Sequence, residues 1–437
     1  IEGTLHAAPI LSQKARGRIT LLDVSAVRSS EGVVAVVSAD DIPGDRLLAT
    51  FVHDEPVFAT DEVQHIGQVL GLVVADSHVN ARAAASKAVL EVKAQSPMLD
   101  ARAAAAKGHT VLPVVKVQRG DAATALAKAP HQWRGQLEVG GQEHYYLETH
   151  IAYIIPQDQG EWLIYSSTQH PGEVQHWVAH ALAIPMHAVR VVCRRMGGGF
   201  GGKETQAGHL AVWAALAARR TGRPVKMRLS REDDFLVSGK RHPFSHDYRI
   251  GFNDQGLLLG LESTQWAHCG FSADLSGPVA DRAVFHTDNA YYLSDVQIES
   301  HRSHLNTQSH TAFRGFGGPQ GMMVIETVMG DIARLLQLDP LEVRLRNLYG
   351  AAPRNTTPYG MTVEDNILPE LMQQLAQNCQ YQTRRQAVAE WNATQGVIRK
   401  GLALTPVKFG ISFTATQFNQ AGALVSVFTD GSVRINH

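Results

Sequence analysis

The chain has 437 residues, with 40 basic and 41 acidic side chains and a formal charge of −1. A balanced charge gives no cationic field that would attract nucleic acid or an anionic membrane, so neither partner is expected. The three cysteines form no CxxC pair, which argues against a disulfide framework, a zinc ribbon and an iron–sulfur cluster in this chain. No apolar run has the length of a membrane span, and we expect a cytoplasmic location.

The first hundred residues alternate strand-like and helix-like segments. Apolar runs predict strands over 18–24, 32–38 and 67–75. The alanine-rich stretch 80–93 predicts a helix with its first residue as the N-cap. Together these segments predict a small α/β domain at residues 1–100.

Proline and glycine residues follow a second alanine-rich stretch at 103–107, and this combination indicates an exposed connection. We therefore assign 101–125 to a linker and 126–437 to a second domain, with an early strand over 133–139. The C-terminal residues 432–437 predict a further strand after a turn. Both chain ends favour the interpretation that the sequence is a piece of a longer protein.

Two later helices are predicted together with their ends. Residues 207–220 place alanine and leucine side chains on one face and end with two arginines before Gly222. Asp339 is a suitable N-cap for a helix with Pro340 at its first position and Glu342 at its third. The expected fold class is mixed, with α/β and α+β parts.

A glycine-rich segment, Met196–Glu204, joins the apolar run 189–192 to the first of these helices. Its glycine and lysine spacing matches a nucleotide-binding P-loop, but Glu204 stands where that loop needs a hydroxyl for magnesium. A flexible linker is the plainer interpretation. It leaves Phe200 among five glycines unexplained, and this aromatic residue indicates a wall over a polar or anionic ligand.

A second glycine cluster, Ala312–Gln320, has the same design and precedes a predicted helix that runs to about Leu338. Arg314 offers a planar fork for phosphate, carboxylate or oxo groups, and Phe316 offers a flat apolar face. Taken singly, Arg314 is better interpreted as a surface cation and Phe316 as a core residue. The two glycine clusters together predict one pocket.

Three other positions are ambiguous from the residues alone. Gln142 is either a turn residue or an amide donor to a ligand oxygen. Glu143, His144 and Glu148 resemble metal ligands in type, but adjacent strand residues point apart, so a zinc site is discounted. Arg282 is by itself an ordinary charged residue, more often in an exposed ion pair than in a catalytic site.

The sequence closely resembles the xanthine dehydrogenase family, specifically the molybdopterin-binding subunit of its bacterial type, and the resemblance covers nearly the whole chain. Its N-terminal part looks like the hammerhead domain of these enzymes, and the remainder looks like the first of two molybdopterin-binding domains. The resemblance rests on five ordered motifs, which are Gly140–Glu148, Met196–Glu204, Arg282–His286, Thr311–Gln320 and Lys408–Phe413.

The resemblance implies a molybdenum–molybdopterin cofactor. It implies that Gln142 hydrogen-bonds an oxygen ligand of molybdenum, that Gly199, Phe200 and Gly201 pack beside the metal, and that the Arg314 loop contacts the cofactor through its backbone. Gln142, Phe200 and Arg314 are thus the expected neighbours of the molybdenum.

The resemblance also implies the substrate residues. Glu204 and Arg282 are expected to bind the polar edges of a purine, with Arg282 stabilising charge that builds on the ring during hydroxylation. Phe316 is expected to pack on the substrate ring. Aldehyde oxidases share these loops but generally have apolar residues at the positions of Glu204 and Arg282, so the charged pair favours xanthine and hypoxanthine as substrates.

Other parts of such an enzyme are not expected in residues 1–437. The resemblance places the general-base glutamate and a further pterin-binding glycine motif in a following C-terminal domain, and FAD and [2Fe-2S] clusters in partner subunits or other domains. We expect this chain alone to be inactive. The alternatives are an aldehyde-oxidising molybdenum hydroxylase and a non-catalytic fragment that only assembles with partner subunits.

Overall fold

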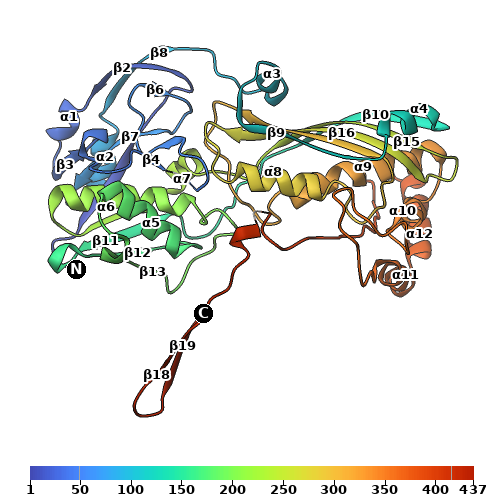
Figure 1. Cartoon of the computed structure of the whole chain (residues 1–437). Coiled ribbons are helices and arrows are strands. Elements are labelled where there is room, and N and C mark those ends of the chain that lie inside the picture. Colours follow the sequence, from blue (N-terminus) through green and yellow to red (C-terminus); the bar gives the residue numbers. More distant parts are fainter. Residues whose placement is uncertain (49, 415) are drawn as a thin grey trace.

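The computed structural model describes residues 1–48, 50–414 and 416–437. Two large β-sheets lie next to one another, each packed with helices, and a thin hairpin projects from the body of the molecule (Figure 1). This mixed architecture confirms the fold class expected from the sequence.

The first sheet combines the N-terminal part of the chain with residues 151–228. Strand β1 lies between β7, which runs antiparallel to it, and β14, which runs parallel. All seven residues of β7 are buried, as its continuous apolar sequence predicts. Across the sheet the strands are β13 (Val189–Val192), β12 (Trp162–Ser166), β11 (Ile151–Pro156), β14 (Val225–Arg228), β1 (Leu5–Leu11), β7 (Val69–Ala75) and β3 (Val33–Val37).

Helices α5 (Pro171–Leu182) and α6 (Gln206–Thr221) pack together with this sheet and form its main apolar core. The predicted helix over 207–220 is confirmed. It ends at Gly222, whose left-handed backbone is strained for residues with a side chain. The shorter elements of this half are α1 (Ser25–Arg28), α7 (Arg231–Val237), β4 (Leu47–Leu48), β5 (Glu55–Pro56) and a three-stranded sheet of β6 (Glu62–Val63), β2 (Gly17–Asp23) and β8 (Val89–Ala94).

The helix predicted over 80–93 is wrong in both bounds. Helix α2 (His78–Ala85) begins after Ser77, whose hydroxyl caps it by accepting a hydrogen bond from the Asn80 amide. Residues 86–88, which include a turn, follow the helix, and the rest of the predicted segment lies in strand β8. Its residues Val89–Val92 alternate in exposure along β8, a strand period that the preceding alanines obscure.

The second sheet carries helices on both faces (Figure 1). Burial alternates along β16, so one face of this strand packs against α8 and α9. The strands, in order, are β10 (His131–Val139), β15 (Phe244–Phe252), β16 (Leu258–Gly270), β17 (Val296–His304) and β9 (Thr110–Arg119); the helices include α8 (Ser276–Phe285), α9 (Gly318–Leu336) and α10 (Pro340–Asn347).

Residues 101–125 are not an irregular connection, contrary to the sequence-based expectation. They form α3 (Ala101–Ala106), the edge strand β9 and the start of α4 (Ala122–Lys128). Ala101 and Ala104 are buried against the second sheet. In a short alanine-rich helix the buried and exposed faces differ little in hydrophobicity. Composition alone therefore does not reveal this packing.

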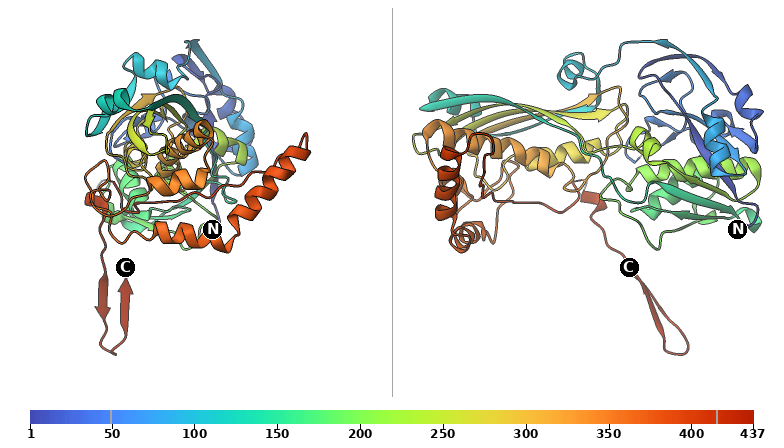
Figure 2. Two further views of the ribbon diagram at one scale, coloured as in Figure 1. Left: turned by 90° about the vertical axis from the view of Figure 1, so that its right-hand side faces the viewer. Right: turned by 180° about the vertical axis from the view of Figure 1, so that it is seen from behind.

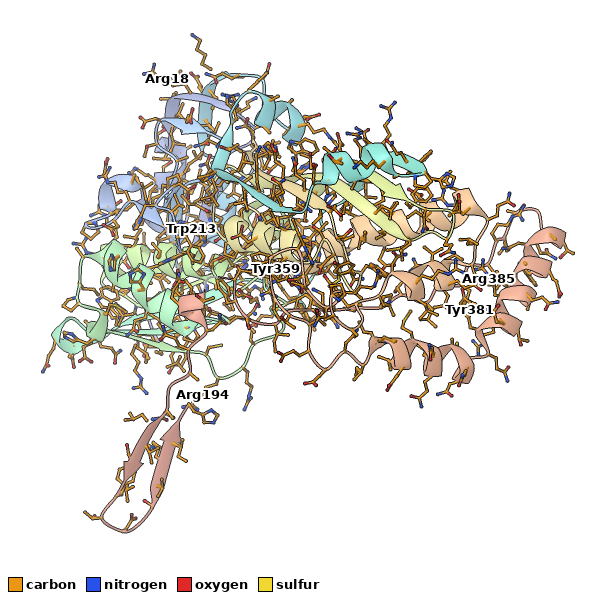
Figure 3. The ribbon with its side chains drawn as sticks, turned by 45° about the vertical axis from the view of Figure 1, so that its right-hand side comes forward. Arg18, Arg194, Trp213, Tyr359, Tyr381 and Arg385 are labelled. Atoms are coloured by element: carbon orange, nitrogen blue, oxygen red, sulfur yellow. The ribbon has the colours of Figure 1, made fainter. Side chains whose placement is uncertain are left out.

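Beyond the second sheet, α11 (Leu368–Asn378) and α12 (Tyr381–Thr394) extend from the body of the molecule (Figure 2). Tyr381 and Arg385 of α12 lie together (Figure 3) and both bind Asp339, the N-cap of α10. The chain then returns and ends in an exposed hairpin of β18 (Leu424–Val427) and β19 (Val433–Asn436). No helix in the described part of the chain is long and apolar enough to cross a membrane.

Candidate functional site

The first glycine-rich loop, Met196–Glu204, is fixed by a buried cation. The Lys203 side chain is 0% exposed and donates hydrogen bonds to the Glu148 carbonyl, at 2.8 Å, and to the Ser167 hydroxyl, at 2.9 Å. The Glu148 carboxylate accepts a hydrogen bond from the Gly197 amide at 2.7 Å. Burial lowers the pKa of Lys203, while the carboxylate of Glu148 opposes this effect. Both ends of the loop are therefore held by groups near β11 and β12.

The middle of this loop leaves no room for larger residues. The Gln169 side-chain oxygen accepts hydrogen bonds from the Gly201 and Lys203 amides at 2.9 and 3.3 Å. A Cβ atom on Gly201 would lie 2.7 Å from the Ala312 carbonyl oxygen, and its φ of +99° also requires glycine. Phe200 has a φ of 55° and its side chain is 53% exposed, so the loop presents this ring at the surface.

The second glycine cluster lies directly against the first. The Arg314 amide donates a hydrogen bond to the Phe200 carbonyl at 2.9 Å. His144 donates from Nε2 to the Ala312 carbonyl at 2.7 Å, and its ring packs 4.6 Å from that of Phe313. The structure thus brings the two glycine clusters together, as the sequence predicts. The Arg314 side chain itself is exposed, and its backbone makes the contact.

Arg241 joins these loops to the Gln142 segment and was missed in the sequence analysis. Its amide donates to the Gln142 carbonyl at 3.0 Å, and its guanidinium donates to the Arg314 carbonyl at 2.7 Å. The guanidinium also lies 4.0 Å from the centre of the Phe313 ring. The one sequence signal is the basic run Lys240-Arg-His242 just before a buried strand, which gives no hint of its partners.

The Arg241 side chain is buried. The residue is 7% exposed, and its Nε and Nη1 atoms have no hydrogen-bond partner among the residues that the structure describes. Within residues 1–48, 50–414 and 416–437 no carboxylate forms an ion pair with it, and burial lowers the pKa of its guanidinium to about 10. Because an unpaired buried cation is costly, this arrangement indicates an anionic or polar ligand beside the loops.

Arg282 and Phe316 also meet in the structure. Arg282 on α8 is 4% exposed, its guanidinium lies 5.6 Å from the Phe316 ring, and it donates to the carbonyls of Gly410 and Ser412. The Phe316 ring lies 5.5 Å from that of Phe413. The guanidinium therefore lies in an aromatic environment, with two nitrogens oriented by backbone carbonyls, and its Nε atom has no partner in the described part of the chain.

Glu204 lies at the end of the first loop, just before α6. Burial, and secondarily the charge of Asp274, raise the pKa of its carboxyl to about 7. Asp274 is itself buried, and desolvation raises its pKa to about 6. No ion pair in the described part of the chain joins Glu204 to Arg282. A cavity of about 370 Å³, lined by Asp274, Asp281 and Thr414 among others, adjoins this region.

The residues considered for zinc have other partners. Glu143 forms an ion pair with Lys240 at 2.6 Å, His144 donates to the Ala312 carbonyl, and Glu148 anchors the first glycine loop. Their side chains stabilise the loops around Gln142, whose own side chain is exposed. The Gln142 amide is thus free to face a ligand.

The geometry can be compared with known proteins. A family model of the molybdopterin cofactor-binding domain matches residues 104–348, more than half of the chain. The chain belongs to the family of molybdopterin cofactor-binding domains. Another model, the a/b hammerhead domain of aldehyde oxidase and xanthine dehydrogenase, matches residues 1–96. A second molybdopterin cofactor-binding domain model matches residues 374–437, which the sequence analysis assigned to the first such domain.

Members of this family with known names match the whole chain. Xanthine dehydrogenase/oxidase of Gallus gallus is 39% identical over 100% of the chain, and xanthine dehydrogenase 1 of Arabidopsis thaliana is 39% identical over 99%. The chain spans about one third, 32%, of the length of each. The solved aldehyde oxidoreductase of Desulfovibrio gigas is 27% identical, with a TM-score of 0.83 over 91% of this chain and 45% of its own.

The residues of this family member fit the molybdopterin cofactor. A Cβ atom would clash with the Gln169 side chain at Gly199 and with the Ala312 carbonyl of the second loop at Gly201, so both positions admit only backbone. Arg241 contributes unpaired buried N–H groups, and the exposed Gln142 amide and Phe200 ring complete the wall. These groups are hydrogen-bond donors and an aromatic ring rather than metal ligands. Such a set suits a cofactor that carries its own metal and anionic groups.

Proposed function

We propose that this chain is the molybdenum-binding part of a cytoplasmic xanthine dehydrogenase that hydroxylates hypoxanthine and xanthine to urate. The observation that carries the proposal is the buried guanidinium of Arg282 beside the aromatic ring of Phe316, together with the raised pKa of the Glu204 carboxyl at the end of the first glycine loop. Aldehydes offer no polar ring edge that would need two such groups, whereas a purine offers several.

Glu204 is suited to orienting a purine. A carboxyl group with a pKa of about 7 is protonated in part at neutral pH, so it can donate to a ring nitrogen or accept from a ring N–H. Its partial burial strengthens either hydrogen bond, because the local dielectric constant is low. This residue binds and orients in the proposal and is not the general base.

Arg282 is suited to stabilising negative charge. Carbonyl acceptors at Gly410 and Ser412 fix the plane of its guanidinium before substrate arrives, so little reorganisation is needed during the reaction. The neighbouring rings of Phe316 and Phe409, at 5.6 and 5.2 Å, exclude water around the cation. A flat substrate packed on Phe316 would place a ring edge near Arg282.

The molybdenum–molybdopterin cofactor, when bound, supplies the oxygen-transfer and redox chemistry. In the proposal the Gln142 amide, the loop Gly199–Gly201 and the Arg314 backbone lie next to its metal. A following C-terminal domain supplies the general base. FAD and [2Fe-2S] clusters on partner subunits or further domains remove the electrons, because the three cysteines here are too few for an all-cysteine cluster.

The test is anaerobic reduction of the complete molybdenum-containing protein by xanthine or by an aromatic aldehyde, in wild type and in Arg282→Met. We expect fast reduction by xanthine in wild type and at least a 1000-fold slower rate in the variant, consistent with loss of a transition-state charge partner worth about 4 kcal/mol. Molybdenum content should not change. Loss of molybdenum in the variant would contradict the assigned role of Arg282.

Oxidation of aldehydes is the alternative, and the structural likeness to the aldehyde oxidoreductase of Desulfovibrio gigas favours it. Under this alternative Glu204→Val leaves turnover of an aromatic aldehyde intact and xanthine reduces the wild-type protein slowly. Reduction by neither compound would instead favour a non-catalytic assembly role.

A further inference from the structure

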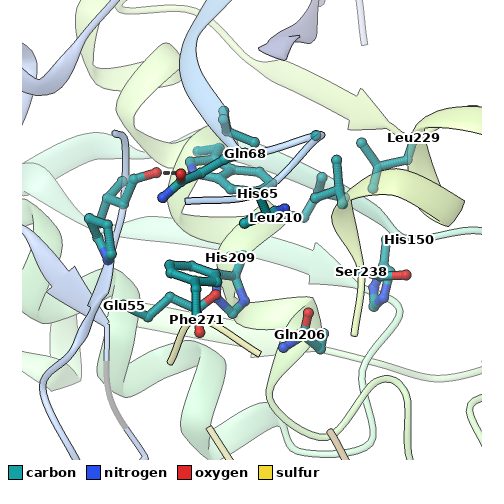
Figure 4. A pocket seen from close by; sticks show the side chains of 16 residues that line it. Glu55, His65, Gln68, His150, Gln206, His209, Leu210, Leu229, Ser238 and Phe271 are labelled. Atoms are coloured by element: carbon teal, nitrogen blue, oxygen red, sulfur yellow. Dashed lines mark hydrogen bonds and ion pairs between the residues drawn. The ribbon is translucent and has the colours of Figure 1, made fainter. Parts of the chain in front are cut away.

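A buried carboxylate from the N-terminal region lies among three segments of the candidate site. Glu55 of β5 accepts a hydrogen bond from His209 Nε2 at 2.7 Å, and the two side chains point toward one another beside Phe271 (Figure 4). Its second oxygen accepts from the hydroxyls of Ser272 and Ser309, the latter at 2.9 Å. One side chain therefore contacts three segments that are far apart in the sequence.

Each of these segments leads into the site. His209 belongs to the first part of α6, which begins directly after Glu204 and the first glycine loop. Ser272 is two residues from Asp274, whose charge acts on Glu204. Ser309 precedes the second glycine cluster.

The neighbouring residue Asp54 strengthens this arrangement. Its carboxylate accepts a hydrogen bond from the Ala273 amide at 2.7 Å. Two consecutive residues of the N-terminal region thus hold the Ser272–Asp274 segment.

The contact is ionic and buried. Burial alone would raise the pKa of Glu55, but His209 and the serine hydroxyls lower it to about 2, and the same ion pair raises the pKa of His209. The ion pair thus favours the charged forms of both groups. Because a buried ion pair tolerates little change in geometry, it fixes the distance between β5 and α6 more tightly than apolar contacts do.

We propose that Glu55 is a positioning residue of the candidate site, through which the N-terminal hammerhead region holds Glu204, Asp274 and the second glycine cluster in register. Glu55 touches neither the substrate nor the cofactor in this proposal. The inference rests on the proposed function for its kinetic consequence, while its structural consequence is independent of the substrate.

The experiment compares Glu55→Ala and Glu55→Gln in the complete protein. The matched control is Asp45→Ala, because Asp45 also joins the N-terminal region to a helix, through an exposed contact with His180 at 3.0 Å, but away from the loops. In Glu55→Ala we expect KM for xanthine to rise at least tenfold, with a smaller fall in kcat and unchanged molybdenum content. Glu55→Gln retains an oxygen for the serine hydroxyls and should recover much of the loss.

Hydrogen exchange supplies a readout that does not depend on the substrate. Amides in residues 272–274 and 309–314 should exchange at least tenfold faster in Glu55→Ala than in wild type or in Asp45→Ala. If Glu55→Ala does not fold, Ser309→Ala removes one hydrogen bond without leaving a buried charge, and it should accelerate exchange in 309–314 alone.

The outcomes separate the two proposals. A wild-type protein that is reduced by aldehyde and not by xanthine overturns the proposed function, and the exchange measurement then still decides the role of Glu55. Unchanged exchange in residues 309–314 of Ser309→Ala, or unchanged exchange or an unchanged KM for xanthine in a folded Glu55→Ala, overturns the positioning role.

Discussion

The two glycine clusters look alike in sequence but are held in different ways. The first is anchored within the first half of the molecule, by the buried side chain of its own Lys203 on the Glu148 carbonyl and by the side-chain oxygen of Gln169 on the Gly201 amide. The second depends on its neighbours, through the Arg314 amide on the Phe200 carbonyl and the Arg241 guanidinium on the Arg314 carbonyl. The first loop is therefore held independently of the second, whereas the second is ordered by contact with the first. We call this arrangement the template model.

This difference predicts an asymmetric response to mutation. Substitutions that remove the anchors of the first loop should also increase the mobility of the second loop, because the Arg314 amide then loses its acceptor, the Phe200 carbonyl. Changes that release the second should leave the first in place. Local opening free energies, measured by hydrogen exchange, report each loop separately.

Lys203→Met should have the largest effect. It leaves the buried Ser167 hydroxyl without its donor, and it leaves the Glu148 carboxylate, which is 36% exposed, without its cation. We expect the opening free energy of the Gly201 and Arg314 amides to fall by about 3 kcal/mol. Lys226→Met, at an exposed position of β14, is the control. Protection of the Arg314 amide that survives in Lys203→Met would contradict the template model.

Glu204→Gln should have the next largest effect, and it depends on pH. The pKa of Glu204 in the folded protein is about 7, above the ordinary 4.5, so between these values the folded state holds a proton that the unfolded state has lost. Stability therefore falls as pH rises from about 4.5 to about 7, on the order of 2 kcal/mol for this group.

Glu204→Gln should remove that loss, so that its stability advantage over wild type is absent near pH 4, grows between about pH 4.5 and 7, and is complete above pH 7. Thermal unfolding of both proteins at a series of pH values measures the difference. The exposed Glu161→Gln should follow wild type throughout. An equal pH dependence in Glu204→Gln would show that other groups, such as Asp274, carry the effect.

Arg241→Lys should have the smallest effect and should reach only the second loop. Lysine keeps the charge but loses the planar contact with Phe313 and the directed hydrogen bond to the Arg314 carbonyl. We expect the opening free energy of the Phe316 amide to fall by about 1 kcal/mol while that of Gly201 is unchanged. Arg249→Lys, in an exposed ion pair on the second sheet, is the matched control.

Local chemistry explains which features the sequence reveals. Gly222 and Asp339 mark helix ends because positive φ and capping are properties of one or two residues. Glycine clusters are similarly visible, since close backbone approach excludes side chains. The helix predicted over 80–93 fails where alanines run without a break into the alternating residues of β8.

Long-range partners explain what the sequence does not reveal. Nothing in the sequence around Arg241 indicates that it stacks on Phe313, and nothing around Glu55 indicates three partners at positions 209, 272 and 309. The meeting of Arg282 with Phe316 likewise depends on how α8 packs against the start of α9. Charged residues in such places look like ordinary surface residues until the fold buries them.

The position of β1 in the first sheet has a consequence for synthesis of the protein. Leu5 pairs with Val225, so this strand keeps one edge without its final partner until β14 leaves the ribosome. At about 5–20 residues per second, that interval is on the order of ten seconds. An open apolar strand edge is a template for pairing with other chains, so nascent copies on neighbouring ribosomes are most prone to aggregate during this interval.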